Sequence, residues 1–204
     1  MPALSRRIVL TTLAGSFVPL TARAEADPAV LAPVHGLIAA LLGIMKQGRT
    51  VPFAERAAAL APAIDRAFDL ATILRESTGA TWTTLTSEQQ GALGEAFRAY
   101  TIASYVHSFD SLAGQRFEVL PETRIVGNST QIVQTRVIAA DGEVHALDYV
   151  MRQSVGWLVV DVLADGSVSR VAVQRSDFRR LLAQGGAAAM VASLRQKTAE
   201  LRGG

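Results

Sequence analysis

Side chains that commonly catalyse reactions or bind metals are few in this sequence and far apart. Its 204 residues include three histidines, His35, His107 and His145, and no cysteine. A zinc site of the HExxH type needs two histidines four residues apart, and no pair here has that spacing. The lack of cysteine excludes a disulfide framework, an iron–sulfur cluster and a thiol nucleophile. We therefore expect no metal site and no other cofactor.

A Ser-His-Asp arrangement is the other chemistry that the sequence suggests, because Ser154 lies close to His145 and Asp148. His145 and Asp148 belong to one predicted strand, in which alternate residues point to opposite faces, so their side chains cannot converge. The chain also lacks a G-x-S-x-G elbow, a Gly-Lys-Ser/Thr phosphate loop and a G-x-G-x-x-G turn. We therefore expect a protein that is not an enzyme.

The first half of the sequence has the periodicity of helices. Apolar residues recur every three or four positions, and proline and glycine divide the pattern into segments. The predicted helices span residues 27–48, 52–60, 64–74 and 86–109. Pro62 is expected to break the helix in which it lies, and Thr86-Ser87-Glu88-Gln89 fits a capping box at the start of the longest helix.

The second half is rich in valine and isoleucine and has the alternation of strands. The predicted strands span residues 117–120, 124–126, 131–139, 144–153, 156–163 and 168–173. Asp141-Gly142 is a strong hairpin signal, and the short connections indicate antiparallel pairing. Two helices follow, over residues 177–184 and 187–201, on either side of Gly185-Gly186.

Helices followed by an antiparallel sheet and by further helices define an α+β fold. We expect the N-terminal helices to cover one face of a curved sheet, with an apolar cavity between the two layers. The candidate lining residues are apolar side chains at core spacing: Trp82, Phe97, Tyr105, Phe109, Val133, Val137, Leu147, Tyr149, Val160, Val162 and Val168. Val160 and Val162 share one face of their predicted strand, opposite Trp157, and the sequence leaves open which face borders the cavity.

Residues 1–24 have the three parts of an export signal. Arg6 and Arg7 precede an apolar run of 13 residues, and Ala22-Arg23-Ala24 offers a signal-peptidase site. Paired arginines and a mildly apolar run favour the twin-arginine route over the general secretory route, whose signals also contain paired arginines by chance. We expect cleavage after residue 24, a single mature domain of residues 25–204, and a periplasmic location.

The excess positive charge belongs to this N-terminal segment. The whole chain has 20 basic and 18 acidic residues, a formal net charge of +2. Three of the arginines and none of the acidic residues lie in residues 1–24, so 17 basic residues remain against 18 acidic ones, a net charge of −1. A near-neutral domain gives no electrostatic reason to expect nucleic acid as a partner.

An ordered series of short motifs resembles the MlaC (toluene-tolerance Ttg2D) family of periplasmic lipid carriers. The series covers about residues 28 to 200 and includes Phe68-Asp69, Gly79-Ala80-Thr81-Trp82, Leu85-Thr86-Ser87-Glu88-Gln89-Gln90, Ala96-Phe97-Arg98, Leu147-Asp148-Tyr149, Trp157-Leu158-Val159-Val160-Asp161-Val162 and Arg175-Ser176-Asp177-Phe178. One departure is Gly166-Ser167-Val168-Ser169, where family members often have Gly-Val-Ser. Gly114-Gln115-Arg116-Phe117 and the stretch from Gly166 to Phe178 resemble the hopanoid-biosynthesis-associated (HpnM-like) branch.

The resemblance implies a soluble carrier that shuttles a lipid between membranes as part of an ABC-type transport system. The implied cargo is a phospholipid or a hopanoid-type lipid. The implied partners are an inner-membrane ABC transporter complex and an outer-membrane lipoprotein complex. An alternative is an NTF2-like enzyme acting on a terpenoid or steroid-like ligand, which would also surround an apolar pocket with helices and a curved sheet, and would need a convergent acid/base pair.

Overall fold

The computed structural model of the chain describes residues 26–127 and 129–203. The predicted export signal, residues 1–24, lies outside these residues. The helices are α1 (Pro28–Gln47), α2 (Phe53–Ala67), α3 (Leu70–Thr78), α4 (Ser87–Ser108) and α5 (Arg170–Gly203), with short 3-10 helices η1 (Gly48–Thr50) and η2 (Gly79–Thr84). The strands are β1 (Arg116–Gly127), β2 (Thr130–Ile138), β3 (Val144–Gln153), β4 (Trp157–Ala164) and β5 (Val168–Ser169).

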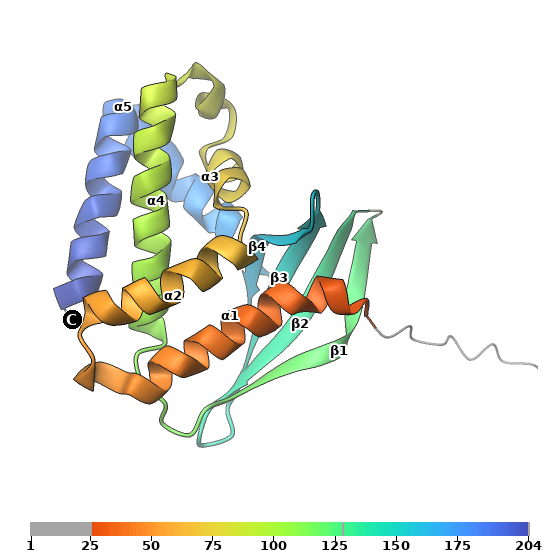
Figure 1. Ribbon diagram of the computed structural model, residues 1–204. Helices are drawn as coiled ribbons and strands as arrows, with labels where there is room; N and C mark the ends of the chain where they lie inside the picture. The colour runs from red at the N-terminus through yellow and green to blue at the C-terminus, as the bar shows by residue number, and fades with distance from the viewer. Residues whose placement is uncertain (1–25, 128, 204) are drawn as a thin grey trace, which may run out of the picture.

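The five strands form one antiparallel sheet in the order β1-β2-β3-β4-β5, so every strand pairs only with its neighbours in the sequence. Helices α1 and α2 cross one face of the sheet, and α4 and α5 run side by side next to them (Figure 1). This arrangement confirms the predicted α+β fold with helices on one face of an antiparallel sheet.

Two helix starts follow the local sequence signals. The Asp27 side chain accepts a hydrogen bond from the Ala29 backbone N–H at 2.9 Å, with Pro28 in the first turn. Thr86 and Gln89 form the predicted capping box, in which each side chain accepts from the other residue's backbone N–H. Both predictions are confirmed because a cap depends only on residues within one turn.

The predicted break at Pro62 is wrong, because α2 continues through it to Ala67. A proline inside a helix removes one backbone hydrogen bond and costs about 3 kcal/mol. Leu60 and Ile64, on either side of Pro62, are both fully buried in the core. Their packing holds the helix together where local propensity would end it. Ile64 therefore belongs to α2, and α3 begins only at Leu70.

The predicted strand over residues 168–173 is also wrong beyond its first two residues. The chain turns into α5 at Arg170, where the Asp161 carboxylate accepts hydrogen bonds from the Val171 backbone N–H at 3.0 Å and from the Ser169 hydroxyl. A carboxylate that accepts backbone N–H groups in this way caps a helix start. The predicted break at Gly185-Gly186 is a kink inside α5, where Gly186 has φ +62°.

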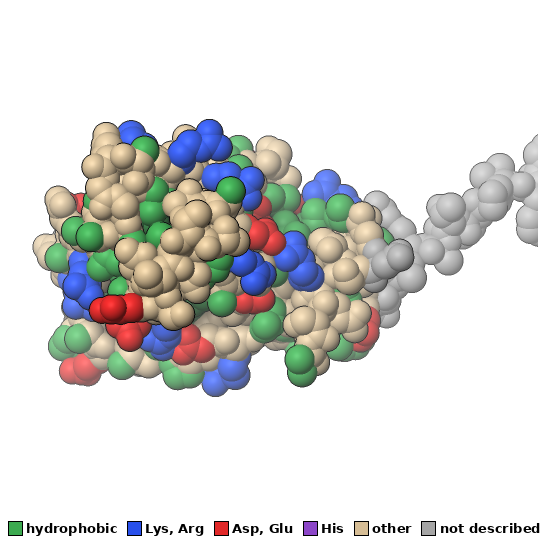
Figure 2. Space-filling view, turned by 90° about the horizontal axis from the view of Figure 1, so that it is seen from above, with side chains coloured by type: hydrophobic (Ala, Val, Ile, Leu, Met, Phe, Trp, Pro, Cys, Tyr) green, Lys and Arg blue, Asp and Glu red, His purple; other side chains and the backbone are tan. Residues whose placement is uncertain are grey.

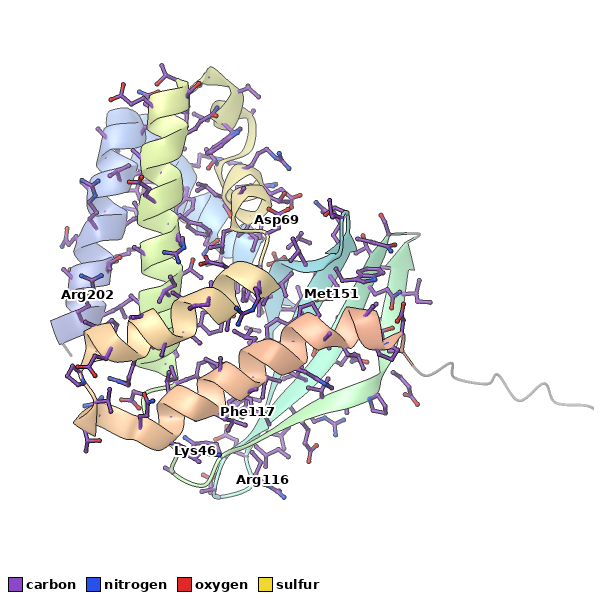
Figure 3. The ribbon with its side chains drawn as sticks, viewed as in Figure 1. Lys46, Asp69, Arg116, Phe117, Met151 and Arg202 are labelled. Carbon is purple, nitrogen blue, oxygen red and sulfur yellow. The ribbon has the colours of Figure 1, made fainter. Side chains whose placement is uncertain are left out.

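The middle of the sheet is packed solidly under α1. Val133, Met151 and Val159 on the helix-facing side have 0 % of their surface exposed, as do Leu37 and Leu41 on α1. Figure 3 shows Met151 where α1 crosses the sheet. The segment Pro28–Thr50 is by length and composition apolar enough to cross a membrane, and an 18-residue window in it has a mean hydropathy of 1.9. Its buried residues pack in the core of this domain.

Polar contacts join the helical part to the sheet at the surface. Basic and acidic side chains lie next to one another between these two parts of the molecule (Figure 2). Arg152 on β3 contacts the Glu76 carboxylate on α3 at 2.8 Å, and Arg175 on α5 donates twice to the Glu76 carbonyl, at 2.8 and 2.6 Å. These contacts connect three elements that are far apart in the sequence.

Candidate functional site

A cavity of about 290 Å³ opens between the sheet and the helices, beside the solid packing under α1. Its walls come from the junction of α2 and α3, from α4, from β3 and β4, and from the first turns of α5. The lining residues are Phe68, Leu70, Ile73, Phe97, Tyr100, Thr101, Ser104, Tyr105, Ser108, Phe109, Leu147, Asp161, Val162, Ala164, Arg170, Val171 and Gln174. Most of this surface is apolar, as expected for a site that holds a hydrophobic ligand.

A row of aromatic rings borders the cavity, and three of its members line it. Tyr149 of β3, Phe68, Tyr105 of α4, Phe109 and Phe117 of β1 contact one another in that order, with ring centroids 5.6 to 6.5 Å apart. Such edge-to-face and offset contacts are favourable and fix the rings in place. The row runs from β3 through the helices to β1. It therefore forms an inner wall of the cavity.

Phe68 reaches this position through a backbone contact. It forms an isolated parallel bridge with Val159, and the Asp69 N–H donates to the Val159 carbonyl at 3.0 Å. The Asp69 side chain, labelled near the start of α3 in Figure 3, then accepts from the Thr72 N–H at 2.9 Å and caps this helix. The junction of α2 and α3 is therefore attached to β4 at the point where the cavity starts.

Tyr105 and Tyr149 form a hydrogen-bonded pair in this wall, in which Tyr149 is buried and Tyr105 is partly buried. Burial raises the pKa of Tyr105 above its ordinary value, while the positive charge of Arg170 and the Tyr149 hydroxyl act in the opposite direction. The pKa of Tyr149 is raised by burial and by the neighbouring Tyr105 hydroxyl. Both hydroxyls are neutral at physiological pH, so the pair supplies hydrogen bonding without charge.

The short polar side chains of α4 create the empty space. The Thr101 hydroxyl donates to the Phe97 carbonyl at 2.9 Å, and the Ser104 hydroxyl donates to the Tyr100 carbonyl at 2.8 Å. Each hydroxyl is thus satisfied within its own helix. These residues line the cavity without filling it and without leaving an unpaired polar group in it.

Two charged residues line the cavity, Asp161 and Arg170. Asp161 accepts from the Val162 N–H at 2.8 Å, from the Val171 N–H at 3.0 Å and from the Ser169 hydroxyl. Its carboxylate is therefore engaged in joining β4 to the start of α5. No group of three or more His, Cys, Asp or Glu side chains that could hold a metal ion occurs in the described part of the chain.

Five of the residues predicted to line the cavity do so: Phe97, Tyr105, Phe109, Leu147 and Val162. Tyr149 does not line the cavity itself, but its hydroxyl contacts that of Tyr105, which does. The other predicted residues do not line the cavity: Trp82, Val133, Val137, Val160 and Val168.

A β-bulge corrects the placement of Val160. Val150 pairs with Asp161 and Met151 pairs with Val159, so Val160 is an extra residue in β4. A bulge shifts which residues point to each face. Val159 and Val162 both face the helices, whereas regular alternation would have kept Val160 and Val162 together.

The remaining corrections have separate causes. Val133 is fully buried in the solid core, and Trp82 packs against that core from η2. Val137 is half-buried and pairs with Phe117 and His145 near the end of the sheet. Val168 follows the Asp165-Gly166 turn, and 49 % of its surface is exposed.

Sequence reasoning missed the polar part of the lining because it selected apolar residues only. A signal was present on α4, where Phe97, Thr101, Tyr105 and Ser108 follow one another at helical spacing and share one face. Arg170, Val171 and Gln174 were missed because that segment was predicted as a strand. The local signal for them is Ser169, whose hydroxyl accepts from the Ala172 N–H as a helix cap does, and the distant Asp161 adds a second contact at the same helix start.

An α+β domain whose helices enclose an apolar cavity against one face of a strand meander has a site that can hold a hydrophobic ligand. The chain is a member of the MlaC family, because the family model described as MlaC protein matches residues 36–196. The fold is similar to that of a phospholipid-binding protein from Ralstonia solanacearum, solved in complex with a phospholipid. The TM-score is 0.73 at 23 % identity, over 86 % of this chain and 99 % of that one. No curated relative matches the chain.

Proposed function

We propose that this protein is a lipid-binding carrier that holds the hydrocarbon part of one lipid in the cavity between α4 and the sheet. The observation that carries the proposal is the cavity itself, which has an aromatic inner wall and hydroxyls satisfied within their own helix. Membership of the MlaC family and the fold shared with a phospholipid-binding protein support the same function.

The energetics of lipid transfer explain why such a cavity is needed. Transfer of one methylene out of water is favourable by about 0.8 kcal/mol. To keep a lipid with roughly 30 methylenes out of a membrane, the protein must therefore replace a free energy on the order of 20 kcal/mol. A cavity of about 290 Å³ lies at the lower end of the range for pockets that hold drug-sized ligands, and a two-chain lipid is larger than those. A two-chain lipid therefore requires the cavity to widen.

Helix α5 is the element best suited to this movement. Its first half contributes Arg170, Val171 and Gln174 to the cavity, while Met190 and Leu194 in its second half are buried in the core. The kink at Gly185 and Gly186 separates the two halves. A shift of the first half would disturb Val171 and Phe178, which are also buried in the core, but would leave Met190 and Leu194 packed.

We further propose that the carrier works in the periplasm, after removal of the predicted signal peptide, and exchanges lipid with an inner-membrane ABC transporter complex and an outer-membrane lipoprotein complex. The cargo is a phospholipid or a hopanoid-type lipid. Family membership supports the location and the soluble carrier role. Replacing Arg6 and Arg7 by lysine should block export if the twin-arginine route is used, and N-terminal sequencing of the periplasmic protein should begin near residue 25.

Binding without catalysis fits the groups in the cavity better than the NTF2-like enzyme does. Such an enzyme needs an acid/base pair that faces the ligand. The oxygens of Asp161 accept local hydrogen bonds, and the raised pKa values of Tyr105 and Tyr149 keep both phenols protonated at neutral pH, so neither supplies the base.

Solvent extraction of the purified protein, followed by mass spectrometry, tests the proposal. The expected result is one lipid per chain, chemically unchanged after prolonged incubation with the protein. The mass of that lipid distinguishes a phospholipid from a hopanoid. Protein purified without lipid that also takes up none from vesicles would contradict the carrier function, and conversion of the lipid to a product would favour an enzyme.

A further inference from the structure

Arg170 occupies an unusual position for a basic residue. It is the first residue of α5, where the helix dipole is positive and acidic side chains are the stabilising choice. Arg170 lines the cavity, its side chain is exposed, and it is the only basic residue there. A residue that departs from the helix-dipole preference next to a binding site is expected to be there for function.

The charge of Arg170 is not neutralised by an ion pair with any carboxylate among residues 26–127 and 129–203. Asp161, the only acidic residue in the lining, uses its oxygens to accept from Val162, Ser169 and Val171. The guanidinium therefore lies at the border of an apolar cavity with its donors available to a ligand.

The backbone at the start of α5 does not compete for the same ligand. The Val171 N–H donates to Asp161, and the Ala172 N–H donates to the Ser169 hydroxyl at 3.0 Å. Gln174 lies one helical turn beyond Arg170 and lines the same cavity. An anionic group at this rim would therefore contact the Arg170 side chain. The carboxylate of Asp161 already accepts other hydrogen bonds, so it does not compete with that group for the guanidinium.

We propose that Arg170 binds the anionic headgroup of the cargo and makes the carrier select lipids with a phosphate at the headgroup over neutral lipids with the same chains. This rests on the proposed carrier function, which requires only that the chains enter the cavity. A guanidinium is suited to the role because it stays charged and matches two phosphate oxygens at once. An exposed position lets the headgroup remain near water, so its charge is not buried unpaired.

Binding of two short-chain lipids to delipidated protein separates the contributions of headgroup and chains. The probes are dioctanoyl phosphatidylglycerol and dioctanoyl glycerol, which share their chains and differ by the phosphate. The variants are R170Q, R170K and, as a matched control on the same helix, R179Q, whose exposed side chain lies outside the cavity. Inorganic phosphate is added as a competitor to distinguish a lipid headgroup from a free anion.

The unmodified protein should bind the phospholipid more tightly than the neutral lipid, by about tenfold or more. R170Q should remove most of that preference without changing dioctanoyl glycerol binding, R170K should restore part of it, and R179Q should change neither. Millimolar inorganic phosphate should not displace the phospholipid, because most of the binding energy comes from the chains.

Two failures are distinguishable. If R170Q keeps the full preference for the phospholipid, or if R179Q lowers that preference as much as R170Q does, the role of Arg170 is wrong and the carrier function stands. If the unmodified protein binds neither lipid and solvent extraction also releases no lipid from it, the carrier function itself is wrong. Thermal melts of all three variants in the absence of lipid verify that each is folded.

Discussion

The same face of the same strands is solid at one place and hollow a few residues away. Met151 of β3 and Val159 of β4 are fully buried under α1, whereas Leu147 and Val162, further along these two strands, border the cavity. All four are apolar residues of the kind that strands place in a core. The difference therefore comes from the covering helices, not from the strands.

The two covering helices differ in the side chains they present. Helix α1 covers the sheet with long aliphatic residues such as Leu37 and Leu41, which fill the space. Helix α4 presents Thr101 and Ser104, whose hydroxyls bond to their own helix, and the aromatic row keeps the surrounding elements apart. The cavity thus exists because small side chains line it and large, rigid aromatic side chains keep the surrounding elements apart.

A buried charge should give the largest difference between the two regions. Met151→Glu places a carboxylate in solid packing, where desolvation costs several kcal/mol, and should abolish cooperative unfolding. Leu147→Glu places the same group at the cavity, where water can reach it, so the domain should stay folded while losing lipid. Thermal melts and lipid occupancy of both variants test this. Loss of folding in both would mean that Leu147 is ordinary core.

Removing one hydroxyl from the aromatic row should have an intermediate effect. Tyr105→Phe leaves the buried Tyr149 hydroxyl without its partner and should cost about 1–3 kcal/mol of unfolding free energy. The double variant Tyr105→Phe/Tyr149→Phe removes both groups and should recover part of that loss. Denaturant unfolding curves measure both values. Equal stability of Tyr105→Phe and the unmodified protein would show that the pair does not stabilise the wall.

Adding volume to α4 should have opposite consequences on its two faces. Ser104→Leu fills the cavity, and should raise the lipid-free stability by about 1 kcal/mol while reducing lipid uptake. Ala96→Leu adds volume where α4 faces solid core, and should lower stability by about 1–3 kcal/mol. Melting temperatures and lipid uptake measure the contrast. Destabilisation by Ser104→Leu would indicate that the cavity has no room for a leucine side chain at this position.

The smallest effect is expected at the surface, away from both regions. Arg98 of α4 donates two hydrogen bonds to Asp65 of α2, at 2.7 and 2.6 Å, and this contact lowers the pKa of Asp65 below its ordinary value of 3.8. Both side chains are more than 40 % exposed, so Arg98→Gln should cost less than about 1 kcal/mol.

The pH dependence of this pair has a defined sign. Because the pKa of Asp65 is lower in the folded protein, the pair stabilises the fold at pH values above about 4, and the contribution is lost as the pH falls through the lowered value. The difference in melting temperature between Arg98→Gln and the unmodified protein should therefore be present at pH 7 and shrink below pH 4. Lipid uptake should be the same in both proteins. An undiminished difference at low pH would exclude the charge of Asp65 as its source.

Features that depend on a few neighbouring residues could be predicted from the sequence. The capping box at Thr86, the hairpin at Asp141-Gly142 and the glycine break in the C-terminal helix are of this kind. The family membership could also be predicted, because it rests on motifs spread along the whole chain.

Features that depend on distant contacts could not be predicted. The continuation of α2 through Pro62 requires the core on both sides, and the start of α5 at Arg170 combines the local Ser169 cap with the distant Asp161 carboxylate. The bulge at Val160 changes the facing of β4 by one residue. For the same reason an apolar pattern could indicate a core but could not indicate which part of it is empty.

The neighbour-to-neighbour order of the strands has a consequence for folding. Each hairpin of the sheet joins adjacent segments, whereas α1 contacts β4 and α4 contacts α5 across much of the chain. Contacts between near segments form sooner than those that close long loops. The cavity needs walls from α3, α4, β3, β4 and α5, so it is among the last features to form.

A lipid that binds only the completed cavity stabilises only fully folded molecules, by RT ln(1 + [L]/Kd). Cargo then acts as a selective stabiliser of chains whose helices have all docked.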